Sequence, residues 1–403
     1  MRKLNPVVCI SLFLILCGSA SPQVMREITE NEKLPGEIKT GAEQTEKYLP
    51  LLSGKRVAVV TNQTGTIGKT HLVDSLVTLK INVKKIFAPE HGFRGTADAG
   101  ELLKSGKDKK TGLTIVSLYG KNNKPTSENL KDIDVVVFDI QDVGVRFYTY
   151  ISTLHYVMEA CAENSKQLIV LDRPNPNGFY VDGPILEEKY KSFVGLHPVP
   201  IVYGLTIGEY ANMINGEAWL KNKMKCDLTV IKLEGYTHKD LYQIPIKPSP
   251  NLPNMTAIYL YPSLALFEGT IISIGRGTEA PFQVIGHPRL KNAKYTFTPH
   301  STTGASNPMY KDSLCYGHDL KEYGEMVVKS SGKLYLFWLQ GTYKDTEDKT
   351  NYFNNYFNSL SGNATLKQQI IDEKSEEEIR KSWEPGLKIF KETRKKYLLY
   401  QDF

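Results

Sequence analysis

The segment FAPEHGFRG (87–95) ends an apolar run with three side chains that can do chemistry. Glu90, His91 and Arg94 stand within five positions, directly after a proline. A carboxyl group that follows an apolar strand is partly desolvated, which favours the protonated form that a general acid needs. His91 and Arg94 can donate hydrogen bonds to an anionic or polyhydroxyl ligand. The structural alternatives are an ion pair between Glu90 and Arg94, a helix-capping acid, and a histidine that anchors the loop.

The segment FDIQDVGVRFYTY (138–150) supplies a second group of candidates. Gln141, Asp142 and Arg146 follow an apolar run, at positions where open parallel sheets bind their ligands. Asp139 ends the run itself, which fits a buried acid that accepts hydrogen bonds from loop amides. Tyr148 stands where the next helix is expected to begin, and the alternative to ligand contact is an aromatic core position.

Two further segments add polar candidates. In LDRPNPNG (171–178), two prolines stiffen the loop that carries Arg173 and Asn175. The alternative there is a rigid turn in which Asp172 pairs with Arg173. The segment LFEGTIISIGRGTEAPFQVIGHP (266–288) contributes Glu268, Arg276 and His287.

Motifs of several enzyme classes are absent from the sequence. TNQTGTIG has the wrong spacing for a GxGxxG fingerprint, and neither GxxxxGK[ST] nor GxSxG occurs. The HExxH spacing of zinc enzymes is also missing. We therefore expect no cofactor and no metal. The net charge of +6 is spread along the chain without a basic block, so nucleic acid is not an expected partner.

The elements that must position these candidates alternate along the first part of the chain. Helical spacing predicts helices at 69–80, 146–164 and 206–220, the last beginning with a capping box that uses Glu209. This alternation predicts an α/β domain, a parallel sheet with helices on both faces. The strands are predicted from apolar runs at 55–65, 82–92, 113–120, 132–144, 166–178 and 226–235.

The proline-dense segment IKPSPNLPNM (246–255) predicts a domain junction. We expect a parallel-sheet domain at 46–250 and a smaller α+β domain at 251–403, packed at the carboxyl edge of the sheet. Two domains also fit the chain length of 403 residues. In the second domain we expect strands within 257–288, 294–302 and 333–340, and helix at 365–398.

The N-terminus has the pattern of an export signal. A basic head precedes an apolar run too short to span a bilayer, and small residues precede a cleavage site after Ala20. We expect 1–20 to be a signal peptide, 21–45 a polar leader segment, and the protein to be periplasmic or extracellular without a membrane span. A lipid anchor at Cys17 is the alternative to simple cleavage. The three later cysteines, far apart in sequence, predict buried free thiols, and the sequence indicates no oligomeric state.

Several motifs, in order, resemble the exo-acting β-N-acetylmuramidase family (NamZ-type, glycoside hydrolase family 171). The resemblance runs from about residue 50 to near the C-terminus. It implies a Rossmann-like domain and a smaller C-terminal domain with the active site between them. It also implies release of N-acetylmuramic acid from non-reducing ends of peptidoglycan fragments, with Glu90 at the position of the proposed catalytic acid. The motifs are PEHGFRG, SLYG, FDIQDVGVRFYTY, LDRPNPNG, VDGPIL, TIGEYANMINGE, SPNLPNM, YPSLALFEGT and GRGTEAPFQVIGHP.

Glycoside cleavage needs a proton donor and stabilisation of an oxocarbenium-like centre. The second carboxylate could be Asp139, Asp142 or Glu268, and the substrate's own acetamido group is a further route. A lactyl carboxylate on the sugar calls for a cation, and the sequence offers four arginines for it. Two other functions stay open: a metal-dependent hydrolase using Glu90, His91, Asp142 and His287, and a non-catalytic wall-sugar-binding protein. The arginines are Arg94, Arg146, Arg173 and Arg276, and the tyrosines that could stack on the ring are Tyr148, Tyr150, Tyr203 and Tyr261.

Overall fold

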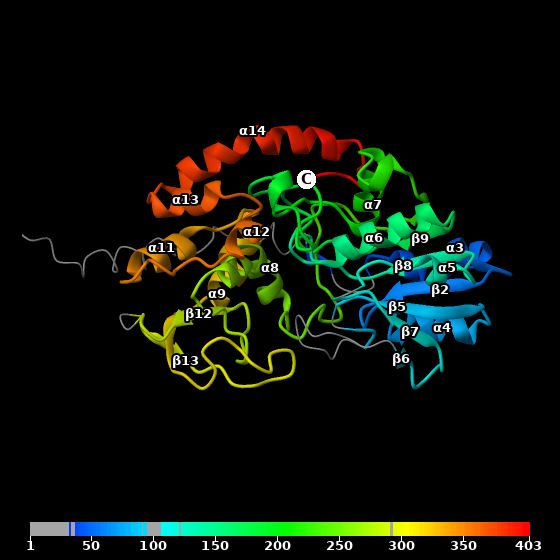
Figure 1. Ribbon diagram of the computed structural model, residues 1–403, viewed down its shortest axis with the longest axis horizontal. Helices are drawn as coiled ribbons and strands as arrows, with labels where there is room; N and C mark the ends of the chain where they lie inside the picture. The colour runs from blue at the N-terminus through cyan, green and yellow to red at the C-terminus, as the bar shows by residue number, and fades with distance from the viewer. Residues whose placement is uncertain (1–31, 34–36, 91, 95–105, 121, 291–292) are drawn as a thin grey trace, which may run out of the picture.

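The computed structural model describes residues 32–33, 37–90, 92–94, 106–120, 122–290 and 293–403. The predicted signal peptide, most of the leader segment, Cys17 and His91 lie outside these residues. Figure 1 shows an N-terminal domain built on a sheet and a C-terminal domain beside it, which is the predicted fold class.

The N-terminal domain is built on a seven-stranded sheet in the order β10-β9-β8-β2-β5-β7-β6. Six strands are parallel, and only β6 runs antiparallel to its neighbour β7. Counted along the chain, the parallel strands lie in the order 3-2-1-4-5-6, the Rossmann arrangement, with its switch point between β2 and β8. The strands are β2 (Val57–Thr61), β5 (Val83–Ala88), β6 (Gly106–Lys107), β7 (Thr114–Ser117), β8 (Val135–Asp139), β9 (Gln167–Leu171) and β10 (Asp227–Ile231).

The central strands β2 and β8 are buried along their whole length because helices cover both faces. Val60 belongs to the same hydrophobic cluster as Leu154 of α6, whereas its neighbour Val59 belongs to a cluster with Leu72 of α4. Alternate residues of one strand thus enter two different cores. The helices are α3 (Thr45–Leu52), α4 (Leu72–Thr78), α5 (Ser127–Leu130), α6 (Tyr150–Glu163) and α7 (Ile207–Gly216).

Shorter elements complete this domain. The capping box predicted at the start of α7 is present, with Thr206 and Glu209 as its two partners. Cys161 and Cys226 are buried free thiols, as is Cys315 in the C-terminal domain, which confirms that prediction. The short elements are β1 (Glu32–Lys33), β3 (Thr66–Ile67), β4 (Thr70–His71), β11 (Leu241–Tyr242), η1 (Gly41–Glu43), η2 (Glu188–Tyr190) and η3 (Lys221–Lys223).

The C-terminal domain combines a three-stranded antiparallel sheet, in the order β12-β14-β13, with helices. Its strands are β12 (Val284–His287), β13 (Tyr295–Phe297) and β14 (Cys315–Asp319). Its helices are α8 (Met255–Leu264), η4 (Ala265–Gly269), α9 (Lys321–Tyr323), η5 (Gly324–Val328), α10 (Lys329–Ser331), α11 (Phe337–Asp345), α12 (Phe357–Ser361), α13 (Thr365–Ile371) and α14 (Glu376–Lys395).

In the C-terminal domain, the strand prediction for 333–340 is wrong, and the one for 257–288 is right only for the strand β12 near its end. The start of 257–288 is the helix α8, whose first turn is capped by the side chain of Asn254 on the backbone of Ala257. Nine of its ten residues are buried, so its sequence lacks the polar face that marks most helices. The segment 333–340 runs into α11 rather than forming a strand, whereas the strand within 294–302 and the helices within 365–398 are present.

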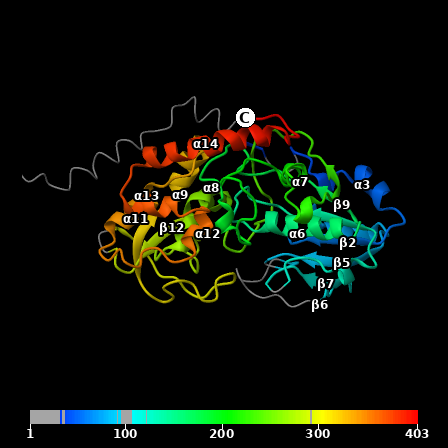
Figure 2. The same cartoon turned by 45° about the horizontal axis from the view of Figure 1, so that its top comes forward.

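The helix α14 crosses from the C-terminal domain back to the N-terminal domain, as both views show (Figures 1 and 2). Arg380 pairs with Asp182 at 2.6 Å, and Arg394 Nε donates to the carbonyl of Gly204 at 2.7 Å. Beyond the helix, the tail returns to the sheet edge, where the Tyr400 hydroxyl donates to Asp172. The two domains are therefore tied together by the end of the chain. No helix among the described residues has the length and apolar character required to cross a bilayer.

Candidate active site

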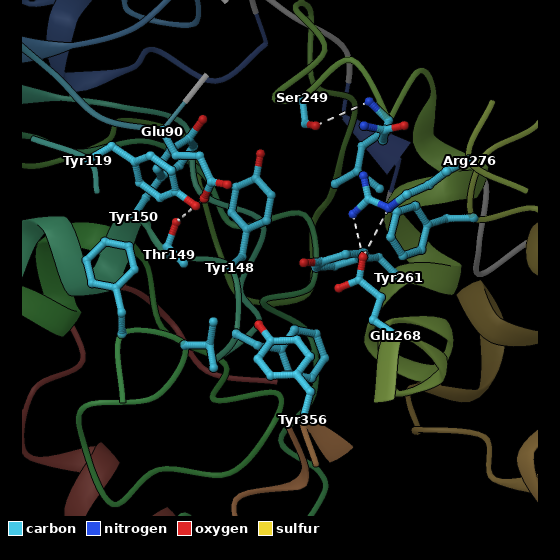
Figure 3. Close-up of a pocket in the computed structure, with 16 residues that line it drawn as sticks. Glu90, Tyr119, Tyr148, Thr149, Tyr150, Ser249, Tyr261, Glu268, Arg276 and Tyr356 are labelled. Atoms are coloured by element: carbon cyan, nitrogen blue, oxygen red, sulfur yellow. Dashed lines mark hydrogen bonds and ion pairs between the residues drawn. The ribbon is translucent and has the colours of Figure 1, made fainter. Parts of the chain in front are cut away.

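A cavity of about 240 Å³ lies between the two domains (Figure 3). Glu90, Tyr119 and Thr149 approach it from the segments that follow β5, β7 and β8, at the carboxyl edge of the parallel sheet. This is where an open α/β sheet binds its ligands. The described residues that line it are Glu90, Tyr119, Phe147, Tyr148, Thr149, Tyr150, Phe193, Val194, Ser249, Asn251, Leu252, Tyr261, Glu268, Arg276, Phe282 and Tyr356.

Glu90 is partly buried. It lies in a turn closed by a hydrogen bond from Gly92 N to the carbonyl of Pro89. Thr149 Oγ1 donates a hydrogen bond to Glu90 Oε2 at 2.9 Å. Tyr119 lines the cavity beside Glu90, and burial together with the charge of that carboxylate raises the pKa of Tyr119. The Thr149 hydroxyl therefore holds the carboxyl group of Glu90 at the cavity wall.

Glu268 and Arg276 form an ion pair on the other side of the cavity (Figure 3). Arg276 Nε and Nη2 lie 3.0 and 2.5 Å from the single oxygen Glu268 Oε1, and each side chain is about a quarter exposed. The guanidinium also lies over the ring of Phe282, at 4.9 Å. Burial lowers the pKa of Arg276, but the charge of Glu268 and the bonds to it outweigh burial and raise it. Arg276 thus presents a fixed positive charge to the cavity.

Aromatic rings form much of the wall between these two groups. Tyr148 makes edge contacts with Tyr150 and Tyr261, at ring-centre distances of 4.8 and 5.7 Å. The Tyr148 hydroxyl is buried and meets no hydrogen-bond partner among the described residues. Burial raises the pKa of Tyr148, so this hydroxyl keeps its proton at neutral pH. A hydroxyl or amide oxygen of a bound ligand can accept a hydrogen bond from the Tyr148 hydroxyl.

Asp139 and Arg173, two predicted site residues, do not line the cavity. They form a buried ion pair in which Arg173 Nε and Nη2 donate to the Asp139 carboxylate at 2.6 and 3.0 Å. Arg173 Nη2 also donates to the carbonyl of Thr66. The pair joins the ends of two neighbouring strands and leaves neither charge facing the cavity.

Asp142 is also enclosed outside the cavity. Its Oδ2 accepts hydrogen bonds from Gly144 N at 2.7 Å and from the Tyr203 hydroxyl, and burial raises its pKa to about 6. Gln141 and Asn175 bond to backbone carbonyls of the same loops. In this structure these three side chains hold the loop framework under the cavity.

The remaining predicted residues lie in other places. Arg146 is fully buried and donates to four backbone carbonyls, two from each side of the domain boundary, and burial lowers its pKa to about 9. Arg94 pairs with Asp108 at 3.0 Å. His287 lines a separate cavity within the C-terminal domain, where its ring contacts Tyr310. Six of the candidates from the sequence therefore line the cavity: Glu90, Tyr148, Tyr150, Tyr261, Glu268 and Arg276.

Most of the lining residues were not among the predicted site residues, and Tyr119, Thr149 and Tyr356 are three of these. Tyr119 follows a predicted strand, so the strand-end rule that selected Glu90 also applies to it. Thr149 adjoins the tyrosines at the start of α6. Tyr356 reaches the cavity only through the packing of the C-terminal domain, and no local pattern marks it.

The cavity offers a carboxyl group, a guanidinium and phenol hydroxyls between aromatic walls. This set suits a ligand with several hydroxyl groups, an apolar ring face and a negative charge. Within the described part of the chain, no group of three or more His, Cys, Asp or Glu side chains is placed to hold a metal ion.

Comparisons with known proteins agree on one family. Residues 57–256 match the model for the N-terminal part of the exo-β-N-acetylmuramidase NamZ, and residues 259–400 match the model for its C-terminal part. The peptidoglycan β-N-acetylmuramidase NamZ of Bacillus subtilis is 39% identical, over 96% of each chain. Two crystal structures of DUF1343-family proteins from Bacteroides fragilis are 47% and 32% identical, with TM-scores of 0.85 and 0.77. Each match covers 91% of this chain and 99% of the other.

Proposed function

The chain belongs to the exo-β-N-acetylmuramidase NamZ family, and from this premise we propose how its cavity does the chemistry. The protein is a glycoside hydrolase that releases N-acetylmuramic acid from the non-reducing ends of peptidoglycan fragments. In our proposal the terminal sugar occupies the cavity between the domains, and Glu90 is the general acid.

The observation that carries this proposal is the setting of Glu90. It is a carboxyl group at the carboxyl edge of the sheet, held by the Thr149 hydroxyl on the wall of the cavity and lying beside Tyr119. A protonated Glu90 gives its proton to the glycosidic oxygen as the bond to the anomeric carbon breaks. The departing saccharide leaves as an alcohol. Water adds a hydroxyl to the anomeric carbon, and the proton that it loses returns the enzyme to its starting protonation state.

The walls of the cavity fit a single terminal sugar. Tyr148 and Tyr261 present aromatic surface to a pyranose ring, and the unpaired Tyr148 hydroxyl can donate to a sugar oxygen. Glu268 and Tyr356 of the C-terminal domain complete the enclosure. A pocket closed in this way admits a chain end, which supports exo-acting cleavage.

Hydrolysis of a chromogenic β-N-acetylmuramide by the purified protein tests the function directly. We expect turnover of this compound, and release of free N-acetylmuramic acid from muramyl disaccharides detected by chromatography. Equal turnover of the corresponding β-N-acetylglucosaminide would contradict the substrate assignment. Binding of N-acetylmuramic acid without any turnover would identify a sugar-binding protein, and loss of turnover with a chelator would identify a metal-dependent hydrolase.

We further propose that residues 1–20 export the protein, because its substrate lies outside the cytoplasm. Expression of the full chain in a bacterial host, followed by mass determination of the exported product, tests this step. A new N-terminus at Ser21 supports simple cleavage, whereas an acylated Cys17 at the N-terminus supports a lipid anchor. Retention of the intact chain in the cytoplasm would contradict both.

A further inference from the structure

Muramic acid differs from glucosamine by one group, an ether-linked lactyl chain that ends in a carboxylate. A site that prefers the muramide must therefore bind the negative charge of the lactyl carboxylate favourably. In a partly desolvated cavity an arginine does this best, because its planar fork binds a carboxylate through two parallel hydrogen bonds. Among the described lining residues, Arg276 is the only arginine, lysine or histidine.

The other three arginines that the sequence offers are occupied elsewhere. Arg94 pairs with Asp108, and Arg173 pairs with the buried Asp139. Arg146 donates to four backbone carbonyls deep in the molecule. None of the three lines the cavity. Recognition of an anionic substituent inside the cavity therefore falls to Arg276.

The contacts of Arg276 leave part of its guanidinium available. Both hydrogen bonds to Glu268 end on the same oxygen, Oε1, and they use the Nε and Nη2 donors. The Phe282 ring packs against one face of the guanidinium plane. No hydrogen bond from Nη1 to another described residue is present, so this donor and the second hydrogen of Nη2 remain for a ligand. These two form one edge of the fork, which is the edge that a carboxylate needs.

We propose that Arg276 recognises the lactyl carboxylate of the substrate and sets the preference for muramides, and that Glu268 positions its guanidinium. The proposal rests on the proposed function of the same cavity. Glu268 and Phe282 fix the plane of the guanidinium before the sugar arrives, so little side-chain freedom is lost on binding. Arg276 is then a specificity residue, and Glu268 is a positioning residue.

Binding to the inactive Glu90→Gln variant, measured by calorimetry, tests the proposal without turnover. The probes are N-acetylmuramic acid, its lactyl carboxamide and N-acetylglucosamine. With Arg276 intact we expect the acid to bind roughly 30- to 100-fold more tightly than the carboxamide, the range of a charge-assisted pair. With Arg276→Gln added, this preference should disappear while the affinity for N-acetylglucosamine stays the same.

Two further variants test the roles separately. Arg276→Lys keeps the charge but loses the fork, so we expect an intermediate preference for the acid. Glu268→Ala should weaken binding of the acid and leave binding of N-acetylglucosamine unchanged. Arg289→Gln, at an exposed arginine of the same domain, is the matched control and should change neither.

The outcomes separate this proposal from the function itself. An undiminished preference for the acid after Arg276→Gln would overturn the role of Arg276, even if the wild-type enzyme hydrolyses muramides. Unchanged acid binding after Glu268→Ala would overturn the positioning role. If the wild type fails to hydrolyse muramides but the inactive variant shows the Arg276-dependent preference, the proposed function fails and the recognition stands.

Discussion

Two sets of carboxylates lie near the same edge of the sheet and have opposite environments. Asp139 ends β8, Asp172 directly follows β9 and Asp142 lies three residues after β8, and all three side chains are enclosed, with at most 6% exposure. Glu90 and Glu268 lie on the cavity wall and are only partly buried. The three enclosed acids (the strand-end set) stabilise the loops, whereas Glu90 and Glu268 (the cavity set) can meet a ligand.

The hydrogen bonds of Asp172 show why this carboxylate is closed to a ligand. Its carboxylate accepts from Thr206 Oγ1, from Gly208 N and from the Tyr400 hydroxyl, at 2.5–2.8 Å. Burial raises its pKa to about 6. A buried acid must be satisfied by such donors, and satisfied oxygens are not available to a substrate.

The largest expected effect belongs to the cavity set. Glu90→Gln keeps the shape of the side chain and its acceptor for Thr149 but removes the transferable proton. We expect kcat on a β-N-acetylmuramide to fall by about 10²- to 10⁴-fold, the usual contribution of a general acid. The melting temperature should change by no more than about 2 °C. If Glu90→Gln kept the kcat of the wild type, Glu90 would not be the general acid, and the difference proposed between the cavity carboxylates and the enclosed ones would be wrong.

The opposite result is expected for the strand-end set. Asp139→Asn leaves the buried guanidinium of Arg173 without its counter-charge, which costs about 3–5 kcal/mol of unfolding free energy. Denaturant unfolding followed by circular dichroism measures this loss. The matched control is Asp134→Asn, which breaks an exposed ion pair with Arg56 and should leave the unfolding free energy almost unchanged. Equal losses in the two variants would contradict the structural role of Asp139.

The pH dependence of the stability of Asp142→Asn tests whether Asp142 is an enclosed acid with a raised pKa. The pKa of Asp142 is raised from 3.8 to about 6 in the folded protein. Between these values the folded state holds more protons than the unfolded state, so wild-type stability from this group falls as pH rises through the window. Asparagine does not titrate, so the stability of the variant relative to the wild type should increase by about 2 kcal/mol from pH 4 to pH 7. Thermal unfolding across this range measures the difference, and a constant difference would contradict the raised pKa.

The smallest expected effect concerns Tyr148. Tyr148→Phe removes a hydroxyl that has no partner among the described residues, so stability should not fall. We expect kcat/KM on the muramide to drop by about 10-fold, the value of one hydrogen bond to substrate. Tyr203→Phe is the counterpart in the enclosed set, because it removes a donor to Asp142 and should lower stability. Lower stability together with unchanged kcat/KM in Tyr148→Phe would contradict the proposed hydrogen bond from Tyr148 to the substrate.

The helices and strands could be predicted from the sequence where the local hydrophobic pattern matches the burial of the residues in the fold. Strands β2 and β8 are continuous apolar runs, and the box at Thr206 and Glu209 marks the start of α7. The helix α8 was missed because nearly every position is buried and no amphipathic period survives. Propensity and spacing therefore predicted the sheet domain better than the C-terminal domain.

The residues of the candidate site could be predicted only in part, for a different reason. Placement after a strand identifies Glu90, and it equally selects Asp139 and Asp142. What separates them is burial by parts of the chain distant in sequence: Arg173, 34 residues away, pairs with the buried Asp139, and Tyr203, 61 residues away, bonds to the buried Asp142, whereas Glu90 stays on the cavity wall. The contribution of Tyr356 depends on how two domains pack together. Such long-range contacts leave no local periodicity.

The crossing of α14 has a consequence for how saccharides enter and leave. A hinge motion that widened the mouth would have to break the Arg380–Asp182 pair and withdraw the Arg394 side chain from Gly204. It would also have to pull Tyr400 off the sheet edge. Passage through a mouth of nearly constant width is therefore expected to limit how bulky a glycan end can be. The segment that carries Tyr400 therefore restrains separation of the two domains, and loss of its contact with Asp172 would loosen that restraint.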